Sequence, residues 1–250
     1  METKSPVPNR SLPQPGESSM ATLEDRWDRR VINPAFIAIL LAMVATSQWI
    51  DHFYKPIPWF WTIVFLVSAV FTGWRYRTTL PEIKQRAQGI RGERIVGQLL
   101  EELRSLGCKV YHDIEETGYN IDHVIIAPSG VFAVETKTRR KSNQKNAHRV
   151  KYDGQKLIFP EWEDNHGLEQ AQRNAKTLSV WLSKAVGESL WVEPILTLPG
   201  WLVDRLAKGK VNVLNPKEII GFISRDTQST LSPQLIQRIS HQLEQRNVIS

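Results

Sequence analysis

The chain has 250 residues, 41% hydrophobic and 23% charged, which allows one globular domain with extensions. A single cysteine, Cys108, excludes an intramolecular disulfide and a cysteine-rich zinc site, and is typical of a reducing compartment. The formal net charge is +6, but after Gly89 there are only 22 Lys and Arg against 19 Asp and Glu, so overall charge does not identify a nucleic-acid-binding protein.

The amino-terminal residues 1–30 include the Pro- and Ser-rich stretch SPVPNRSLPQPGESS. Such a composition is too polar to bury a core. The sequence therefore predicts a disordered cytoplasmic tail over residues 1–30.

Two long apolar segments follow, residues 31–50 and 57–74, and neither contains a charged residue. Each approaches the roughly 20 residues that an α-helix needs to cross a bilayer. Aromatic residues gather near the short connection DHFYKP and at the far end, as they do at membrane interfaces: Trp49, Phe53, Tyr54, Trp59, Trp61, Trp74 and Tyr76. We therefore favour a transmembrane helical hairpin over residues 31–76, with the lipid bilayer as a partner, over a buried hairpin in a soluble core.

Basic residues flank the predicted hairpin on both sides: Arg26, Arg29 and Arg30 before it, and Arg75, Arg77, Lys84 and Arg86 after it. The positive-inside rule then places both termini in the cytoplasm. This pattern predicts a multi-pass protein of a bacterial-type inner membrane. The late first apolar segment, directly followed by a second, does not fit a signal peptide.

The next segment, LPEIKQRAQGIRGERIVGQLLEELRSLG, has the apolar periodicity of a helix. Gly89 and Gly92 interrupt it and predict a separate juxtamembrane linker over residues 77–89. Glu93 shares a helix face with Val96, so it is expected at the rim of the core. An acid at a helix start can also simply complement the helix dipole.

Residues 120–137, NIDHVIIAPSGVFAVETK, read as two strands joined at a Pro-Ser-Gly turn, after a first strand KVYHDIEE. Alternation about that turn places Asp122 opposite Glu135, with Lys137 on the same face and His123 on the other. Directly opposed like charges destabilise a sheet unless they share a proton or a cation, and hard divalent metals prefer oxygen ligands. The pair is thus either half of a metal site or a surface cluster neutralised by Lys137.

A run of basic residues without an intervening acid follows the hairpin: Lys137, Arg139, Arg140, Lys141, Lys145, Arg149 and Lys151. Such a run can bind phosphates or can be a solvated loop.

Alternating helical and strand patterns occupy the rest of the chain. A short strand is predicted in YDGQKLIF, a helix in GLEQAQRNAKTLSVWLSKAV with Gln170 beside its apolar stripe, and buried strands in EPILTLPGWLV and KVNVL. Two further helices are expected to start at Asn215-Pro216 and Ser232-Pro233, which are cap and first-turn signals. This order predicts an α/β sandwich around a mixed sheet.

Three motifs in this order resemble a known family. Asp122, followed by Glu135-Thr136-Lys137, is similar to the D…(D/E)xK signature of restriction-endonuclease-like nucleases. Together with Glu93 in RGERIVGQLLEEL and Gln170 in GLEQAQ, it resembles the nuclease-related domain, NERD, from about residue 90 to 214. The middle residue of the triplet, usually apolar in that family, is a threonine here.

The resemblance implies a restriction-endonuclease-like α/β sandwich with a mixed central sheet over residues 90–225, followed by a carboxy-terminal helix in 226–250. It also implies metal-dependent hydrolysis of phosphodiester bonds in nucleic acid, with DNA favoured. Mg²⁺ or Mn²⁺ would be held by Glu93, Asp122, Glu135 and the carbonyl of Thr136. The catalytic residues would be Glu93, Asp122, Glu135, Lys137 and Gln170, and phosphates would contact Arg139, Arg140, Lys141, Lys145 and Arg149. A catalytically inactive membrane-tethered module that binds nucleic acid or protein is the alternative.

Overall fold

The computed structural model describes residues 13–50, 57–116, 119–141, 148–225 and 231–249. The predicted loop DHFYKP and Lys145 lie outside these ranges. Two compact units divide the chain: a helical unit, residues 18–88, and a globular unit, residues 89–250, which also includes the segment before residue 18.

The helical unit consists of consecutive helices and the first part of a long one. Its elements are α1 (Glu17–Trp27), the π-helical turn η1 (Asp28–Ile32), α2 (Asn33–Ile50) and α3 (Pro58–Leu100), whose last part enters the globular unit. Residues 17–30, predicted to be disordered, are therefore helical. Arg26 and Arg30 each form an ion pair with Glu82 of α3, a long-range contact that composition alone does not reveal.

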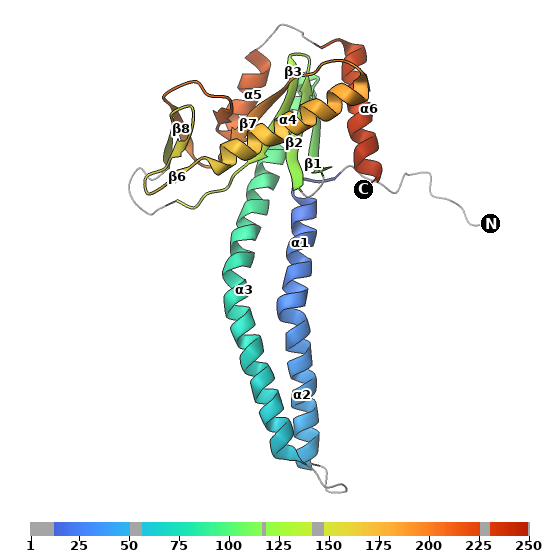
Figure 1. Cartoon of the computed structure of the whole chain (residues 1–250), viewed down its shortest axis with the longest axis vertical. Coiled ribbons are helices and arrows are strands. Elements are labelled where there is room, and N and C mark those ends of the chain that lie inside the picture. The colour runs from blue at the N-terminus through green and yellow to red at the C-terminus, as the bar shows by residue number, and fades with distance from the viewer. Residues whose placement is uncertain (1–12, 51–56, 117–118, 142–147, 226–230, 250) are drawn as a thin grey trace, which may run out of the picture. The chain divides into compact units, whose positions relative to one another are not determined.

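Within the helical unit, contacts between α1–α2 and α3 run in antiparallel order. Trp49 Nε1 donates to Thr62 Oγ1 at 3.1 Å near one end, and the ring of Trp27 meets that of Tyr76 at 6.1 Å further along. The two helical stretches thus lie side by side (Figure 1).

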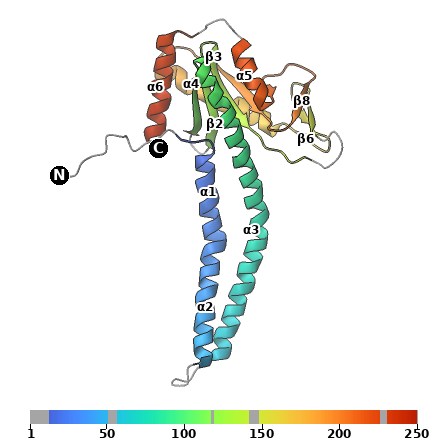
Figure 2. The ribbon, with the colours of Figure 1, turned by 180° about the vertical axis from the view of Figure 1, so that it is seen from behind.

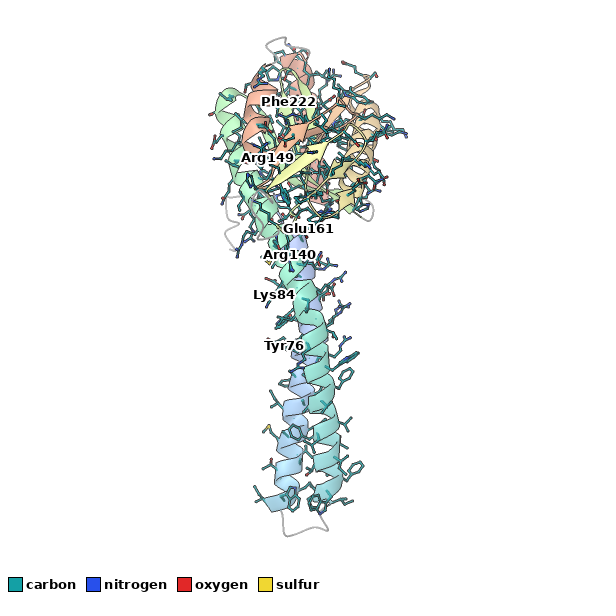
Figure 3. All side chains as sticks on the ribbon, turned by 90° about the vertical axis from the view of Figure 1, so that its left-hand side faces the viewer. Tyr76, Lys84, Arg140, Arg149, Glu161 and Phe222 are labelled. Atoms are coloured by element: carbon teal, nitrogen blue, oxygen red, sulfur yellow. The ribbon has the colours of Figure 1, made fainter. Side chains whose placement is uncertain are left out.

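Apolar side chains cover the outside of the helical unit (Figure 3). Among the described residues, 25 large hydrophobic side chains are exposed, and 19 of them fall between Ile32 and Tyr76. The helical stretch Glu17–Ile50 is long and apolar enough to cross a membrane, and among the described residues no second helix meets the same test. The other predicted segment, residues 57–74, is not a separate helix but the start of α3.

Helix α3 continues without a break through the predicted linker, residues 77–89. Of the two glycines that suggested a break, Gly89 has no atom within 4 Å of where a Cβ would be, whereas a Cβ on Gly92 would lie 2.0 Å from Oγ1 of Thr138. A third glycine, Gly97, has a similar packing role, since its Cβ would lie 2.3 Å from Cγ of Pro15. Glycine at these two positions permits close approach by other segments, at a helix-propensity cost of about 1 kcal/mol each.

The globular unit contains the predicted helices and hairpin in the predicted order, but some strands differ from the prediction. Apart from Tyr152, which ends the strand at residues 149–152, YDGQKLIF is a strand only at residues 157–158. EPILTLPGWLV is divided between a buried strand and a partly exposed one, and the strands at residues 149–152 and 163–164 were not predicted. After η2 (Glu101–Leu106) come β1 (Lys109–Glu116), β2 (Tyr119–Ala127), β3 (Gly130–Thr136), β4 (Arg149–Tyr152), β5 (Leu157–Ile158), β6 (Glu163–Asp164), α4 (His166–Val186), β7 (Val192–Thr197), β8 (Leu202–Arg205), β9 (Asn212–Leu214), α5 (Pro216–Arg225) and α6 (Pro233–Ile249). The five-stranded sheet has the order β1-β2-β3-β7-β9, and a four-stranded sheet has the order β6-β5-β4-β8. Since β1, β2 and β3 pair antiparallel while β3, β7 and β9 pair parallel, the predicted mixed α/β architecture is confirmed.

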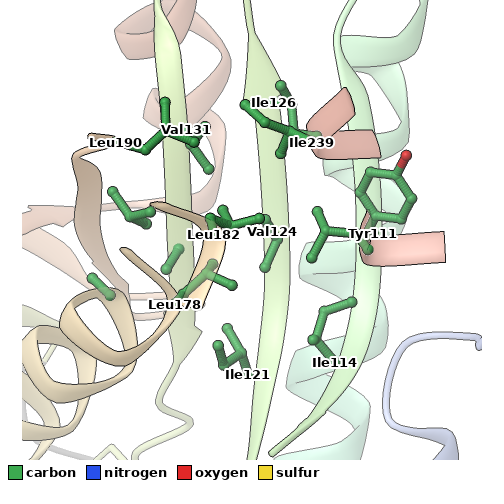
Figure 4. Close-up of a cluster of buried hydrophobic side chains, with 14 of the residues drawn as sticks. Tyr111, Ile114, Ile121, Val124, Ile126, Val131, Leu178, Leu182, Leu190 and Ile239 are labelled. Atoms are coloured by element: carbon green, nitrogen blue, oxygen red, sulfur yellow. The ribbon is translucent and has the colours of Figure 1, made fainter. Parts of the chain in front are cut away.

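Helices cover both faces of the five-stranded sheet. Leu178 and Leu182 of α4 and Ile239 of α6 pack on Val124 and Val131 on one face (Figure 4). Helix α6 is therefore a layer of the globular core and not an appendage.

The opposite face of the sheet is covered by α3 and α5, which Figure 2 shows from behind. Val96 and Leu100 of α3 and Ile219 of α5 pack with Ile125 and Val134 there. Glu135 lies at the end of β3, next to the first turns of α4.

Candidate active site

The β2–β3 hairpin has the predicted register, which ends with His123 opposite Val134. Asp122 and Glu135 occupy the next opposed positions. There the strands separate, and the side chain of Asp122 enters the gap, where its Oδ2 accepts the backbone N–H of Thr136 at 2.7 Å. The ladder thus holds Asp122 beside the end of β3.

Glu135 is 2% exposed and its carboxylate has a donor on each oxygen. Lys137 Nζ lies 2.7 Å from Oε1, and Asn174 Nδ2 donates to Oε2 at 2.8 Å. Both oxygens of Glu135 are therefore held in one orientation.

The environment of the two carboxyl groups disfavours their ionised forms unless a proton or a cation is bound. Burial, with the nearby charges of Glu135 and Glu93, raises the pKa of Asp122 well above its usual range. Burial also raises the pKa of Glu135, although Lys137 opposes that shift. Glu135 is buried and Asp122 is half-buried. Two neighbouring acids whose ionised forms repel each other offer the oxygen ligands that a divalent cation prefers.

Glu93 lies half-buried on α3, as its position beside Val96 predicts. Its charge acts on Asp122, and its Oε2 lies 3.0 Å from where a Cβ on Gly16 would be, so the segment before α1 packs against it. Within the described part of the chain, no three His, Cys, Asp or Glu side chains converge closely enough to hold a metal ion. The structure brings Asp122 and Glu135 together and leaves Glu93 as a third charge nearby.

Helix α4 supplies the polar residues on the other side of Glu135. The first turn packs on Lys137, whose Cγ lies 3.3 Å from where a Cβ on Gly167 would be. Gln170 is half-buried one turn before Asn174.

Asn174 is the residue of this site that the sequence pattern did not reveal. It is 1% exposed, and within the described part of the chain its Oδ1 has no hydrogen-bond partner. The available signal was its place on the buried stripe of α4, between Ala171 and Leu178, where periodicity calls for an apolar side chain.

The predicted phosphate-binding run is only partly available to a ligand. Arg139 donates to Asp164 Oδ2 at 2.6 Å and Arg149 to Asp204 Oδ1 at 2.9 Å, so both cations are paired inside the globular unit. Arg140 and Lys141 are exposed, and Figure 3 labels Arg140 and Arg149.

His123 points to the sheet face opposite Asp122, as alternation predicts. Its Nδ1 lies 2.9 Å from Nδ1 of His112, whose Nε2 meets Glu101 Oε1 at 2.7 Å. Burial lowers the pKa of both imidazoles, and for His112 it does so against the charge of Glu101. This histidine pair is a polar element of the core that spacing in the sequence did not predict.

The site combines an acid on each of two adjacent strands, a lysine two residues beyond the second acid, and a helix that orients the second acid. Residues 88–199 match the nuclease-related domain, NERD. The matched range starts two residues before the predicted start at residue 90 and ends at residue 199, 15 residues before the predicted end at 214.

The match to the nuclease-related domain covers the elements from the end of α3 to β7. Among solved structures, SfsA of Pyrococcus furiosus in complex with Ca²⁺ is similar to 62% of this chain, at 18% identity and a TM-score of 0.24. The chain spans 53% of that protein, and a TM-score of this size does not establish a shared fold. No curated protein sequence matches the chain.

Proposed function

We propose that the nuclease-related domain hydrolyses phosphodiester bonds of nucleic acid, with DNA as the favoured substrate, on a restriction-endonuclease-like fold. The observation that carries this proposal is the convergence of Asp122 and Glu135 at the end of the hairpin with Lys137 in contact with Glu135. A purely structural role does not call for a half-buried acid beside a buried one, because the like charges cost folding free energy.

A divalent cation, Mg²⁺ or Mn²⁺, fits this pair. Asp122 and Glu135 would hold it, with Glu93 and the backbone carbonyl of Thr136 completing the set. A bound divalent ion lowers the pKa of water and stabilises charge on a phosphoryl group.

The chain's own residues would position the substrate and transfer protons. The ammonium of Lys137, paired with Glu135, would stabilise negative charge that develops on a phosphate oxygen. The amide of Gln170, one turn before Asn174 on α4, would orient water or a phosphate oxygen. Asn174 holds Glu135 in place and so keeps the geometry of both acids.

We further propose that residues 31–50 and 57–74 lie in a bilayer as a helical hairpin, with both termini cytoplasmic in an inner membrane of bacterial type. Support comes from the apolar side chains exposed between Ile32 and Tyr76. A periplasm-active reporter inserted after Asp51 would be active and one after Ser250 silent. The reverse pattern would contradict this topology.

A membrane-tethered binding module without catalytic activity is the second candidate. It is favoured by the absence, among the described side chains, of three converging metal ligands and by the ion pair that neutralises Glu135.

Cleavage by the full chain in detergent separates the two candidates. Labelled linear and circular DNA and RNA are incubated with Mg²⁺, with Mn²⁺ or with chelator, and the matched control is Asp122→Asn. The proposal expects cleavage that needs the metal and is lost in the variant. Binding without cleavage under every condition would favour the binding module.

A further inference from the structure

The helix beside the proposed catalytic pair carries an exposed cation. Arg173 lies on α4, three residues after Gln170 and one before Asn174, whose amide contacts Glu135. It is exposed, and no ion pair between described residues includes it. Arg139 and Arg149, by contrast, are neutralised by aspartates.

An aromatic ring lies against this cation. The guanidinium carbon of Arg173 lies 5.9 Å from the ring centroid of Tyr119, at the start of β2. The ring is partly buried and packs against the core beneath α4 and α6, which supports it from the other side. A cation held over a ring by this weak attraction keeps its N–H donors for another acceptor.

The charge of Arg173 reaches the site. It is among the groups that lower the pKa of Glu135, after Lys137 and Asn174. Residues three and four apart on a helix are neighbours, so Gln170, Arg173 and Asn174 form one ridge. Lys137 packs on the first turn of the same helix, at Gly167. The hydrogen-bond donors of this ridge and of Lys137 therefore lie along α4, beside the end of β3.

We propose that Arg173, supported by the ring of Tyr119, binds a backbone phosphate of DNA, so that the substrate strand passes along the α4 ridge next to Glu135 and Lys137. This inference rests on the proposed function. A guanidinium binds a phosphate through two parallel N–H donors, and such a contact holds the strand without reading its sequence. Tyr119 is a positioning residue, since it acts through Arg173.

The test measures binding and not cleavage. Affinity of the full chain in detergent for a fluorescent DNA duplex is measured in chelator over a range of salt concentrations. Loss of one phosphate contact lowers the slope of log affinity against log salt by about 0.9 for duplex DNA. We expect this change for Arg173→Ala, and no change for Lys184→Ala, which removes one exposed charge from the last turn of the same helix.

Variants of the supporting ring provide the second arm. Tyr119→Phe keeps the ring and removes a buried hydroxyl that has no hydrogen-bond partner in the described part of the chain, so the affinity is expected to stay the same. Tyr119→Leu removes the ring and is expected to weaken binding. Arg173→Lys is expected to keep the salt slope, because it keeps the charge, but to bind more weakly without the planar fork.

Two failures can be told apart. If the wild type does not bind DNA, the proposed function itself is contradicted. If the wild type binds DNA, two results would overturn the phosphate site at Arg173 and leave the proposed function standing. One is a salt slope of Arg173→Ala equal to that of the wild type, and the other is a slope lowered as much by Lys184→Ala as by Arg173→Ala. Should Arg173→Ala fail to unfold cooperatively, the same comparison is made with Arg173→Gln and with the Tyr119 pair.

Discussion

Asn174 of α4 and Glu135 of β3, 39 residues apart in sequence, are joined by a hydrogen bond of 2.8 Å from Nδ2 to Oε2. Both side chains are almost completely buried. The conformation of the acid is thus set in part by a helix that packs on the sheet, and not only by Lys137 at the end of the hairpin that carries it. Asn174 is therefore as much a part of the site as the two acids.

Changes at Asn174 test this dependence. Asn174→Ala leaves one oxygen of Glu135 without its donor, which is expected to lower the free energy of unfolding by about 1–3 kcal/mol in urea titration. Asn174→Asp places a second acid against Glu135, so it is expected to destabilise the domain in chelator and to regain stability when Mg²⁺ is added. Equal stability of Asn174→Asp and wild type in chelator would contradict the contact.

Asp122→Asn tests the proposed cation site. The amide oxygen can still accept the Thr136 N–H, but the repulsion with Glu135 is removed. In chelator, we expect the free energy of unfolding of the variant to equal or exceed that of the wild type. Calorimetric titration is expected to show a clear loss of Mg²⁺ affinity, and cleavage is expected to be lost. Unchanged Mg²⁺ affinity would rule out the site.

Lys137→Ala separates a catalytic lysine from a neutralising one. Because Glu135 is buried, removal of its cation leaves an uncompensated charge, and destabilisation of a few kcal/mol is expected in chelator. A divalent ion can replace that charge, so Mg²⁺ is expected to restore stability without restoring cleavage. If Mg²⁺ has no effect on the unfolding of this variant, Lys137 only neutralises the cluster.

The basic run divides into structural and exposed residues. Arg139→Ala removes the partner of Asp164, which is 14% exposed, and is expected to cost on the order of 1 kcal/mol while leaving the salt dependence of DNA binding nearly unchanged. Replacement of Arg140 and Lys141 is expected to show the opposite pattern, lower salt dependence at constant stability. Identical behaviour of the two variants in both measurements would contradict this division.

The pair His112–His123 makes stability depend on pH. Burial lowers the pKa of both groups below the value near 6.5 of an unfolded histidine. Below that pH the unfolded chain binds protons that the folded chain does not, so stability is lost as pH falls, by up to about 1.4 kcal/mol per pH unit for each proton.

The matched variant is His123→Asn, whose amide can keep a hydrogen bond to His112 and does not titrate. The raised pKa values of Asp122 and Glu135 have the opposite effect, stabilising the fold as pH falls, but they are present in both proteins and cancel in the difference. Urea unfolding between pH 8 and pH 5 is expected to show a shallower decline for the variant. Parallel curves would mean that His123 does not titrate differently on folding.

The sequence by itself determined the strands, the hairpin register and the meeting of Asp122 with Glu135. These features follow from local rules: side chains alternate along a strand, and a tight turn sets which residues oppose each other. For the same reason His123 could be assigned to the other face. The apolar, uncharged character of residues 31–50 is likewise visible without a structure.

Only the tertiary structure decided what lies around the pair. Gly92 looks like a helix break in the sequence, yet the helix continues through it and Thr138 packs against it, a role that can be recognised only when the neighbouring segment is known. Arg139 looks like a phosphate ligand until Asp164 is placed beside it. These contacts join segments far apart in the chain, and their partners are chosen by the packing of helices on the sheet, which periodicity and composition do not encode.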